Sequence, residues 1–170
     1  MKSKKYLGKT IAVSGGFDPL HIGHLDMFKS AKELVGQEGK LVVFVNSDIF
    51  LKKKKSKAFM KLKDRMHLIQ ALRGVDRVYP VIDKDMTVQK TLLKYMPDVF
   101  ANGGDRTQNN IPEFAVCEKL GIEMLFNVGG KKTRSSSELL KNYSKKNSTT
   151  RSPKRNDILK NSTGIKNKKY

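Results

Sequence analysis

Two histidines in a glycine-rich segment near the N-terminus are the residues of this sequence best suited to phosphate chemistry. The segment reads Gly15-Gly16-Phe17-Asp18-Pro19-Leu20-His21-Ile22-Gly23-His24 and follows a short apolar run. Glycines allow a tight turn and a close approach of the backbone to a ligand, and the free N–H groups of a helix start attract phosphate. His21 and His24 have the spacing that places side chains on one side of a helix. We therefore expect both imidazoles to stabilise the charge that builds on an α-phosphate during phosphoryl or nucleotidyl transfer.

Two other readings of these histidines stay open at this point. A pair of histidines on a helix could bind a metal, but the zincin pattern needs His-Glu-x-x-His, and here the spacing is one residue shorter with no Glu between. Both rings could also pack in the core. The segment contains neither the GKS or GKT of a Walker P-loop nor G-x-G-x-x-G, so dinucleotide redox chemistry has no specific support.

The elements that position this segment follow from an alternation of short apolar runs with longer amphipathic ones. We predict strands over 10–14, 41–45, 77–82, 99–101 and 123–128, and helices over 24–35, 62–72, 88–95, 113–120 and 135–143. Continuously apolar strands that alternate with helices are typical of a parallel sheet covered on both faces. The expected fold class is α/β, a Rossmann-like doubly wound sheet of five parallel strands. Ligands of such sheets bind beyond the carboxyl ends of the strands, which here means the loops at 15–24, 46–60, 102–112 and 129–137.

The charge of the chain is strongly positive and unevenly distributed. Among 170 residues, 35 are Lys or Arg and 16 are Asp or Glu, a formal net charge of +19. We expect one globular domain over 1–140 and a lysine-rich, disordered tail over 141–170 that could contact polyanions. A second basic run spans Lys52 to Arg65 and is either a solvated, nucleic-acid-attracting face or a binding loop.

Several classes of protein are excluded by what the sequence lacks. No apolar run is long enough for a membrane-spanning helix, and the lysine-rich start has no apolar signal region, so we expect a cytoplasmic protein. The single cysteine, Cys117, lies in a helical apolar pattern and is predicted to fill the core, which leaves no disulfide framework and no cysteine-based zinc site. His67 is predicted to be a surface or packing residue.

The glycine-rich segment is similar to the (T/S/G)xGxFDxxHxGH signature of the cytidylyltransferase-like nucleotidyltransferases. Further segments match that family in order: Asn46-Ser47-Asp48, Asp64-Arg65, Asn102-Gly103-Gly104-Asp105-Arg106 and Ser135-Ser136-Ser137-Glu138-Leu139-Leu140. The resemblance covers about residues 9 to 142. It implies transfer of CMP or AMP from CTP or ATP to a small sugar or polyol phosphate, with release of pyrophosphate, dependence on Mg²⁺ bound at unknown ligands, and a homodimer by analogy with relatives.

The resemblance also implies roles for individual residues. His21 and His24 would bind the nucleotide phosphates and stabilise the transition state, with the backbone of Gly16 and Phe17 nearby, and Asp18 would shape the entrance. Lys55 is the catalytic lysine expected in the loop after the second strand, with Lys54 and Lys57 as alternatives. Arg65 would bind the phosphate of the acceptor.

The later segments are expected to hold the nucleotide itself. By the same resemblance, the base and ribose pocket would be lined by Asn102, Gly103, Gly104 and Asp105. Hydrogen bonds to the β- and γ-phosphates would come from the serine run of Ser135, Ser136 and Ser137, which could equally be a helix cap. Arg134 precedes this run where relatives commonly have a small or uncharged residue, and its role stays open.

Three functions are left as alternatives by the sequence. Glycerol-3-phosphate cytidylyltransferase is the leading specific candidate. A heptose-1-phosphate type of adenylyltransferase is second, because Gly103-Gly104-Asp105 with Ile111-Pro112-Glu113 downstream looks closer to that group. The third is a nucleic-acid-binding module in which the basic tail contacts phosphates and the nucleotide fold is inactive.

Overall fold

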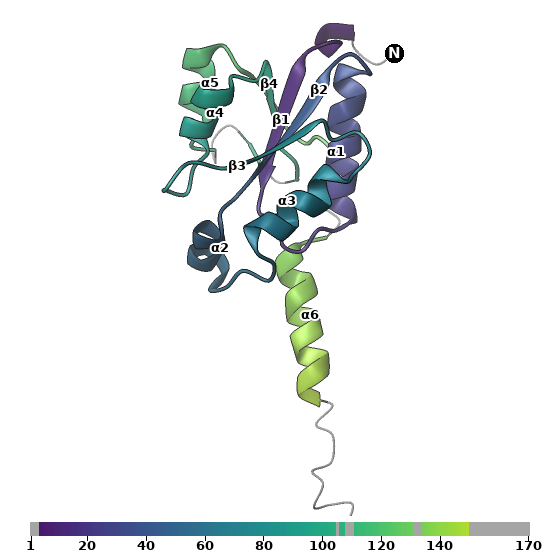
Figure 1. Ribbon diagram of the computed structural model, residues 1–170, viewed down its shortest axis with the longest axis vertical. Helices are drawn as coiled ribbons and strands as arrows, with labels where there is room; N and C mark the ends of the chain where they lie inside the picture. Colours follow the sequence, from purple (N-terminus) through teal and green to yellow (C-terminus); the bar gives the residue numbers. More distant parts are fainter. Residues whose placement is uncertain (1–3, 105, 108–110, 131–133, 150–170) are drawn as a thin grey trace, which may run out of the picture. The chain divides into compact units, whose positions relative to one another are not determined.

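The structure, a computed structural model, describes residues 4–104, 106–107, 111–130 and 134–149. The chain divides into two compact units, Met1–Ser137 and Glu138–Tyr170, and the first contains the sheet (Figure 1). The expected role of Asp105 and the expected disorder of residues 150–170 lie outside the described residues. No helix within the described ranges has the length and apolar character needed to cross a bilayer.

Five parallel strands form one sheet in the order β3-β2-β1-β4-β5. Their bounds are β1 Thr10–Gly15, β2 Lys40–Val45, β3 Arg77–Pro80, β4 Val99–Ala101 and β5 Glu123–Leu125. The predicted fold class is therefore confirmed, although β3 and β5 end earlier than their apolar runs suggested. The strand order reverses between β1 and β4, and this is the point at which a doubly wound sheet opens a crevice for ligands.

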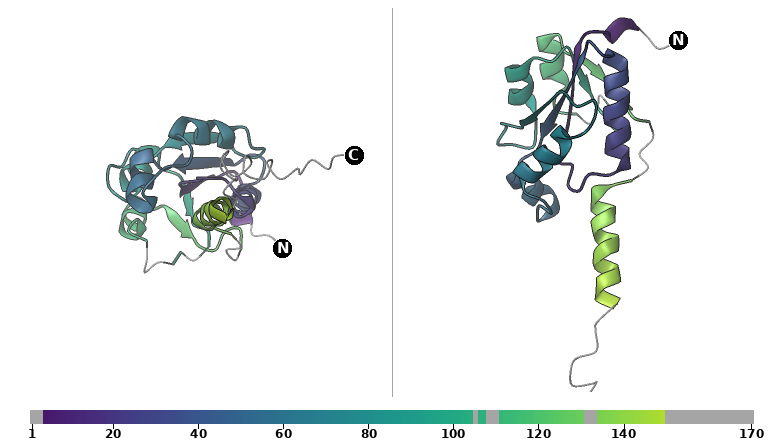
Figure 2. Two further views of the ribbon diagram at one scale, coloured as in Figure 1. Left: turned by 90° about the horizontal axis from the view of Figure 1, so that it is seen from below. Right: turned by 45° about the vertical axis from the view of Figure 1, so that its right-hand side comes forward.

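Helices cover both faces of the sheet, as Figures 1 and 2 show. The first compact unit contains η1 Lys4–Tyr6, α1 Ile22–Val35, α2 Asp48–Lys55, α3 Leu62–Gln70, α4 Gln89–Tyr95 and α5 Phe114–Leu120. Alternate residues of β1 face opposite sides: Ile11 and Val13 pack in the cluster of α1 and α3, and Ala12 packs in the cluster of α4 and α5. Cys117 belongs to the second cluster and is fully buried, as predicted.

Helix α2 lies inside the segment that was predicted as a loop over 46–60. Ser47 caps its N-terminus by accepting a hydrogen bond from the amide of Phe50 at 3.1 Å. Asp48 lies in its first turn and four lysines lie in its last turn, and both arrangements are favourable with the helix dipole. This helix has only eight residues, of which Leu51 alone is buried. So short a segment has too few apolar positions for periodicity to predict a helix, and the sequence prediction was wrong here.

The last described helix, α6, spans Ser136–Thr149. The boundary expected at residue 141 falls within this helix. Helix continuation is consistent with the good helix propensity of Leu, Lys and Glu in its first turns.

Candidate functional site

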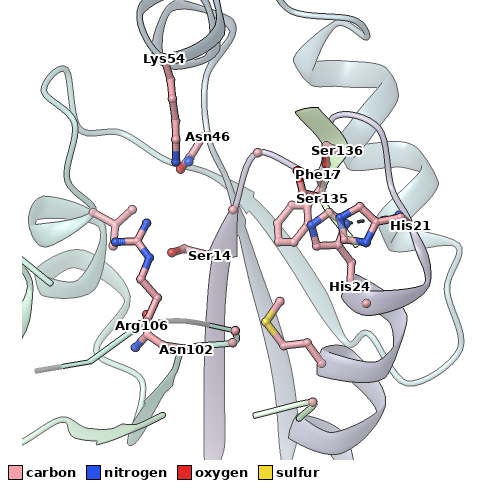
Figure 3. Close-up of a pocket in the computed structure, with 18 of the residues that line it drawn as sticks. Ser14, Phe17, His21, His24, Asn46, Lys54, Asn102, Arg106, Ser135 and Ser136 are labelled. Atoms are coloured by element: carbon pink, nitrogen blue, oxygen red, sulfur yellow. Dashed lines mark hydrogen bonds between the residues drawn. The ribbon is translucent and has the colours of Figure 1, made fainter. Parts of the chain in front are cut away.

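A cavity of about 390 Å³ opens at the carboxyl ends of the central strands. Its lining comes from all four of the loops predicted from the sequence, together with α2 and the starts of α1 and α6. Figure 3 shows His21 and His24 on one side of β1 and Asn102 and Arg106 on the other. This volume lies within the range of about 300–1,000 Å³ that is usual for small-molecule sites.

The two histidines form a stacked pair at the start of α1. His21 is the N-cap residue, and the two ring centroids are 3.7 Å apart with an angle of 20° between the planes. The amide of His21 donates to Nδ1 of His24 at 3.3 Å, so the hydrogen of a neutral His24 ring is carried by Nε2. The rings of Phe17 and His24 form a T-shaped contact with a centroid distance of 4.9 Å, which helps to fix the orientation of that imidazole.

The electrostatic surroundings keep His24 neutral. Burial, followed by the positive neighbours His21 and Lys55, lowers the pKa of His24 from 6.5 to about 3. At neutral pH the ring is therefore an uncharged hydrogen-bond donor through Nε2. Such a donor stabilises an oxyanion without a proton first having to be taken up.

Four of the other lining residues carry cationic side chains. They are Lys54, Lys55, Arg106 and Arg134. Nζ of Lys55 donates to the carbonyl of Asp18 at 3.3 Å, and burial is the main cause that lowers the pKa of Lys55. Lys57, the other candidate, does not line the cavity. A cavity with this charge favours a polyanionic ligand.

Two asparagine side chains have a buried polar atom without a hydrogen-bond partner among the described residues. Oδ1 of Asn46 and Nδ2 of Asn102 are buried and have no hydrogen-bond partner in the described structure. Buried polar atoms of native proteins are almost always paired. Both side chains line the cavity, so a ligand with matching donors and acceptors would complete their hydrogen bonding.

The serine run lies beside the glycine-rich loop. Ser135, Ser136 and Ser137 all line the cavity, and Oγ of Ser136 donates to the carbonyl of Pro19 at 2.9 Å. This bond joins the start of α6 to the loop that carries the histidines. The loop over 128–130 packs closely as well, because a Cβ on Gly129 would lie 2.7 Å from the backbone of Met27.

The structure brings most of the predicted site residues together. Besides the histidines, Lys55 and the serines, the lining includes Gly16, Phe17, Asn102, Gly103 and Gly104. A Cβ on Gly16 would lie 2.7 Å from Cδ2 of Leu51, so a side chain there would require Leu51 to shift. Segments that are far apart in the sequence therefore form one site at the switch point of the sheet.

Asp18 and Arg65, which were also predicted as site residues, are not part of the cavity lining. Asp18 is fully buried, and its carboxylate accepts from the amides of Phe59 at 2.7 Å and Met60 at 2.8 Å. Arg65 is also fully buried, and its guanidinium donates to protein oxygens. Its acceptors are the carbonyls of Met60, Gly16 and Asn46 and the carboxylate of Asp48. Arg65 is thus oriented toward the protein interior and not toward an acceptor phosphate.

Sequence reasoning missed several lining residues. Met27, Val88 and Phe100 supply apolar surface, and Glu113 supplies a carboxylate. The apolar residues carried no signal beyond ordinary core patterns. Glu113 did carry one, since it follows Ile111-Pro112 and is the first residue of the helix predicted over 113–120. The start of a helix that follows a parallel strand lies at the same sheet edge as the other site loops.

The described residues contain no cluster of three or more His, Cys, Asp or Glu side chains that could hold a metal ion. Glu113 is the one carboxylate among the described lining residues. The neutral and cationic groups around it are suited to binding an anion directly.

Comparisons with known proteins show which family this chain resembles. Residues 12–144 match the model of a family described as Cytidylyltransferase-like. The chain is 34% identical over 122 residues to the FAD synthase of Korarchaeum cryptofilum, an alignment that covers 70% of this chain and 81% of that protein. It is 35% identical over 116 residues to the bifunctional protein HldE of Streptomyces coelicolor, covering 67% of this chain and 24% of that longer protein.

A solved structure shows the same architecture. The lipopolysaccharide core biosynthesis protein from Thermoplasma volcanium superposes with a TM-score of 0.59 at 27% identity, covering 70% of this chain and 95% of that one. The family match spans the histidine loop, the α2 lysines and the serine run. The chain belongs to the cytidylyltransferase-like family, and it is a nucleotidyltransferase.

Proposed function

We propose that this protein transfers AMP from ATP to FMN and thereby forms FAD and pyrophosphate. The observation that carries the proposal is the alignment with a FAD synthase over 81% of that enzyme's length. In the reaction an oxygen of the FMN phosphate attacks the α-phosphorus of ATP, and the bond from that phosphorus to the pyrophosphate oxygen breaks. Because the attacking oxygen is already an anion, positioning and charge neutralisation supply most of the catalysis.

The stacked histidines are suited to the α-phosphate in this proposal. Nε2–H of neutral His24 donates to an oxygen of the phosphate, and this bond strengthens as charge builds in the transition state. The backbone of Gly16 and Phe17 lies on the same loop. His21 supports the orientation of His24 through its amide and its stacked ring.

The other lining groups are assigned to the rest of the nucleotide. Lys55, with Lys54 beside it, neutralises the triphosphate, and the serine run at the start of α6 holds the β- and γ-phosphates through hydroxyl and amide groups. Asn102, Gly103 and Gly104 hold the base and ribose. Arg65 is assigned no direct contact with substrate, because its donors are engaged by protein oxygens.

Magnesium fits this site as an ion carried by the triphosphate. The described residues supply no carboxylate cluster for it, and Mg²⁺ at nucleotide sites commonly keeps substrate phosphates and water as most of its ligands. When bound it would neutralise part of the phosphate charge. The protein's own contribution is the arrangement of lysines, serines and histidine around those phosphates.

A sugar phosphate is the second candidate acceptor. The likeness to HldE and to a lipopolysaccharide core biosynthesis protein favours it, and so does the resemblance of the Gly103-Gly104 segment to heptose-1-phosphate adenylyltransferases. The relatives reported above give no support to glycerol 3-phosphate, the acceptor that the sequence first suggested. The predicted transfer of CMP from CTP rested on the same resemblance to glycerol-3-phosphate cytidylyltransferase.

The test measures pyrophosphate release for ATP and CTP, each with FMN, a heptose 1-phosphate and glycerol 3-phosphate. We expect release with ATP and FMN, together with FAD detected by chromatography. In the His24→Ala variant kcat should fall by about 100-fold or more while KM for ATP changes much less. Release with a heptose phosphate and none with FMN would replace the proposal by the second candidate.

A further inference from the structure

Glu113 is the exception to the charge of the cavity. It is 7% exposed and is the one acidic residue among the described lining residues. The Lys and Arg residues of the same lining are Lys54, Lys55, Arg106 and Arg134. A buried carboxylate is costly unless hydrogen-bond donors surround it. In a cavity that suits a polyanion, such a group would repel the phosphates, so it must face a part of the ligand that carries no negative charge.

The fold places Glu113 away from the histidines. It is the N-cap residue of α5, which lies beside α4 on the face of the sheet opposite α1 (Figure 1). His21 is at the start of α1. The cavity therefore extends from the histidine pair across the ends of β1 and β4 to Glu113. With the triphosphate at the histidines, the nucleoside reaches the Glu113 end.

Local contacts fix the carboxylate and leave it able to accept more hydrogen bonds. Oε1 of Glu113 accepts from the amide of Val88 at 2.9 Å, a buried bond that ties the start of α5 to the start of α4. An ionised carboxylate has about four lone-pair positions, and one amide satisfies one of them. Two adjacent hydroxyl groups on a ligand match the remaining capacity of two carboxylate oxygens.

We propose that Glu113 is a specificity residue that accepts hydrogen bonds from the 2′- and 3′-hydroxyls of the nucleotide ribose. The proposal rests on the proposed use of a nucleoside triphosphate. Glu113 selects ribonucleotides over deoxyribonucleotides, and it rejects nucleotides with a phosphate on either hydroxyl because two anions would then meet in a buried site.

The experiment compares ATP with 2′-deoxy-ATP, 3′-deoxy-ATP and 3′-phospho-ATP in the full-length protein, the Glu113→Gln variant and the Glu118→Gln variant. Glu118 is exposed on the same helix and is the matched control. Binding of the non-hydrolysable α,β-methylene forms is measured by calorimetry, so the result does not depend on the acceptor. Failure to form FAD would overturn the proposed function and leave this binding test intact.

The parent protein should bind ATP about tenfold or more tightly than at least one deoxy form, the size expected for a lost hydrogen bond to a charged group. In Glu113→Gln that preference should fall to about threefold or less, and 3′-phospho-ATP should bind better than in the parent; Glu118→Gln should behave as the parent. Equal binding of ribo and deoxy forms by the parent protein would overturn the proposal even if the variant failed to fold. An unchanged preference for ATP over the deoxy forms in a folded Glu113→Gln protein would also overturn it.

Discussion

The guanidinium of Arg65 donates from Nη1 to the carbonyl of Gly16 at 2.7 Å, and from the same nitrogen to the carbonyl of Asn46 at 2.9 Å. These carbonyls directly follow β1 and β2. Nη2 pairs with Asp48, at the start of α2, at 2.6 Å. One buried side chain therefore sets the spacing between the loop that carries the histidines and the helix that carries Lys55.

Replacing Arg65 by Gln should destabilise the protein and reduce catalysis together. Glutamine leaves Asp48 and the two carbonyls without their charged donor, and loss of one partner of a buried ion pair costs about 3–5 kcal/mol. Urea denaturation should show this loss of unfolding free energy. In the fraction that remains folded, kcat should fall more than the affinity for ATP, since Arg65 does not line the cavity.

Arg73→Gln is the matched control because Arg73 is exposed, and it should leave both measurements unchanged. Arg65→Lys should be more stable than Arg65→Gln because it keeps a positive charge near Asp48. It should be less stable than the parent protein, since one ammonium reaches fewer of these oxygens than a guanidinium. If Arg65→Gln kept full stability and raised only the KM for the acceptor, Arg65 would be a substrate ligand as the sequence first suggested.

The pKa of His24 should be visible in the pH dependence of stability. In the folded protein it is lowered to about 3, whereas in the unfolded chain it is near the ordinary value of about 6.5. As pH falls below about 6.5 the unfolded state binds a proton that the folded state does not, so the free energy of unfolding decreases toward pH 3. The His24→Gln variant lacks this group and should lose less stability over the same range.

Nuclear magnetic resonance measures the same property directly. The ¹⁵N spectrum of His24 should show the neutral ring with hydrogen on Nε2 at pH 5. Binding of a triphosphate should raise the pKa of His24, because negative charge favours the protonated ring. A midpoint near 6.5 in the unliganded protein would contradict the burial and hydrogen bond described for this residue.

Gly129 should tolerate a side chain less well than its neighbour. Both Gly129 and Gly130 have positive φ, at 89° and 79°, but a Cβ on Gly129 would lie 2.7 Å from the backbone of Met27, and nothing lies within 4 Å of one on Gly130. Each alanine costs about 1 kcal/mol or more for its backbone conformation. Gly129→Ala should cost about 1–3 kcal/mol beyond that, and it should weaken ATP binding because α1 must move. Equal midpoints of thermal unfolding for the two variants would refute this close approach.

Removal of residues 150–170 separates the enzyme from the nucleic-acid-binding alternative. This segment is rich in Lys and Arg with a single Asp, so its loss should weaken binding to a DNA duplex and reduce the salt dependence of that binding. The rate of pyrophosphate release should stay within about twofold of the parent rate, which corresponds to a change of well under ~1 kcal/mol in the activation free energy. A truncated protein that folds but releases none would favour a function centred on the tail.

The amino-acid sequence by itself determined the parts of this protein that depend on neighbours along the chain. The alternation of apolar runs predicted the parallel sheet, since buried strands and amphipathic helices have different periods. The spacing of His21 and His24 placed both rings at one helix start, and the glycines before them marked the loop. These features are local, so pattern and chain direction suffice to locate them.

The tertiary structure decided which charged groups meet the ligand. Arg65 and Lys55 both belong to one basic run, but only Lys55 lines the cavity. The guanidinium of Arg65 is buried and donates hydrogen bonds to carbonyls that follow two different strands. The position of the Glu113 carboxylate also depends on a distant segment, because its hydrogen-bond donor is the amide of Val88 at the start of another helix. Whether a charge is paired inside the protein or presented to a ligand depends on oxygens and amides brought from distant segments, and only the folded chain defines that arrangement.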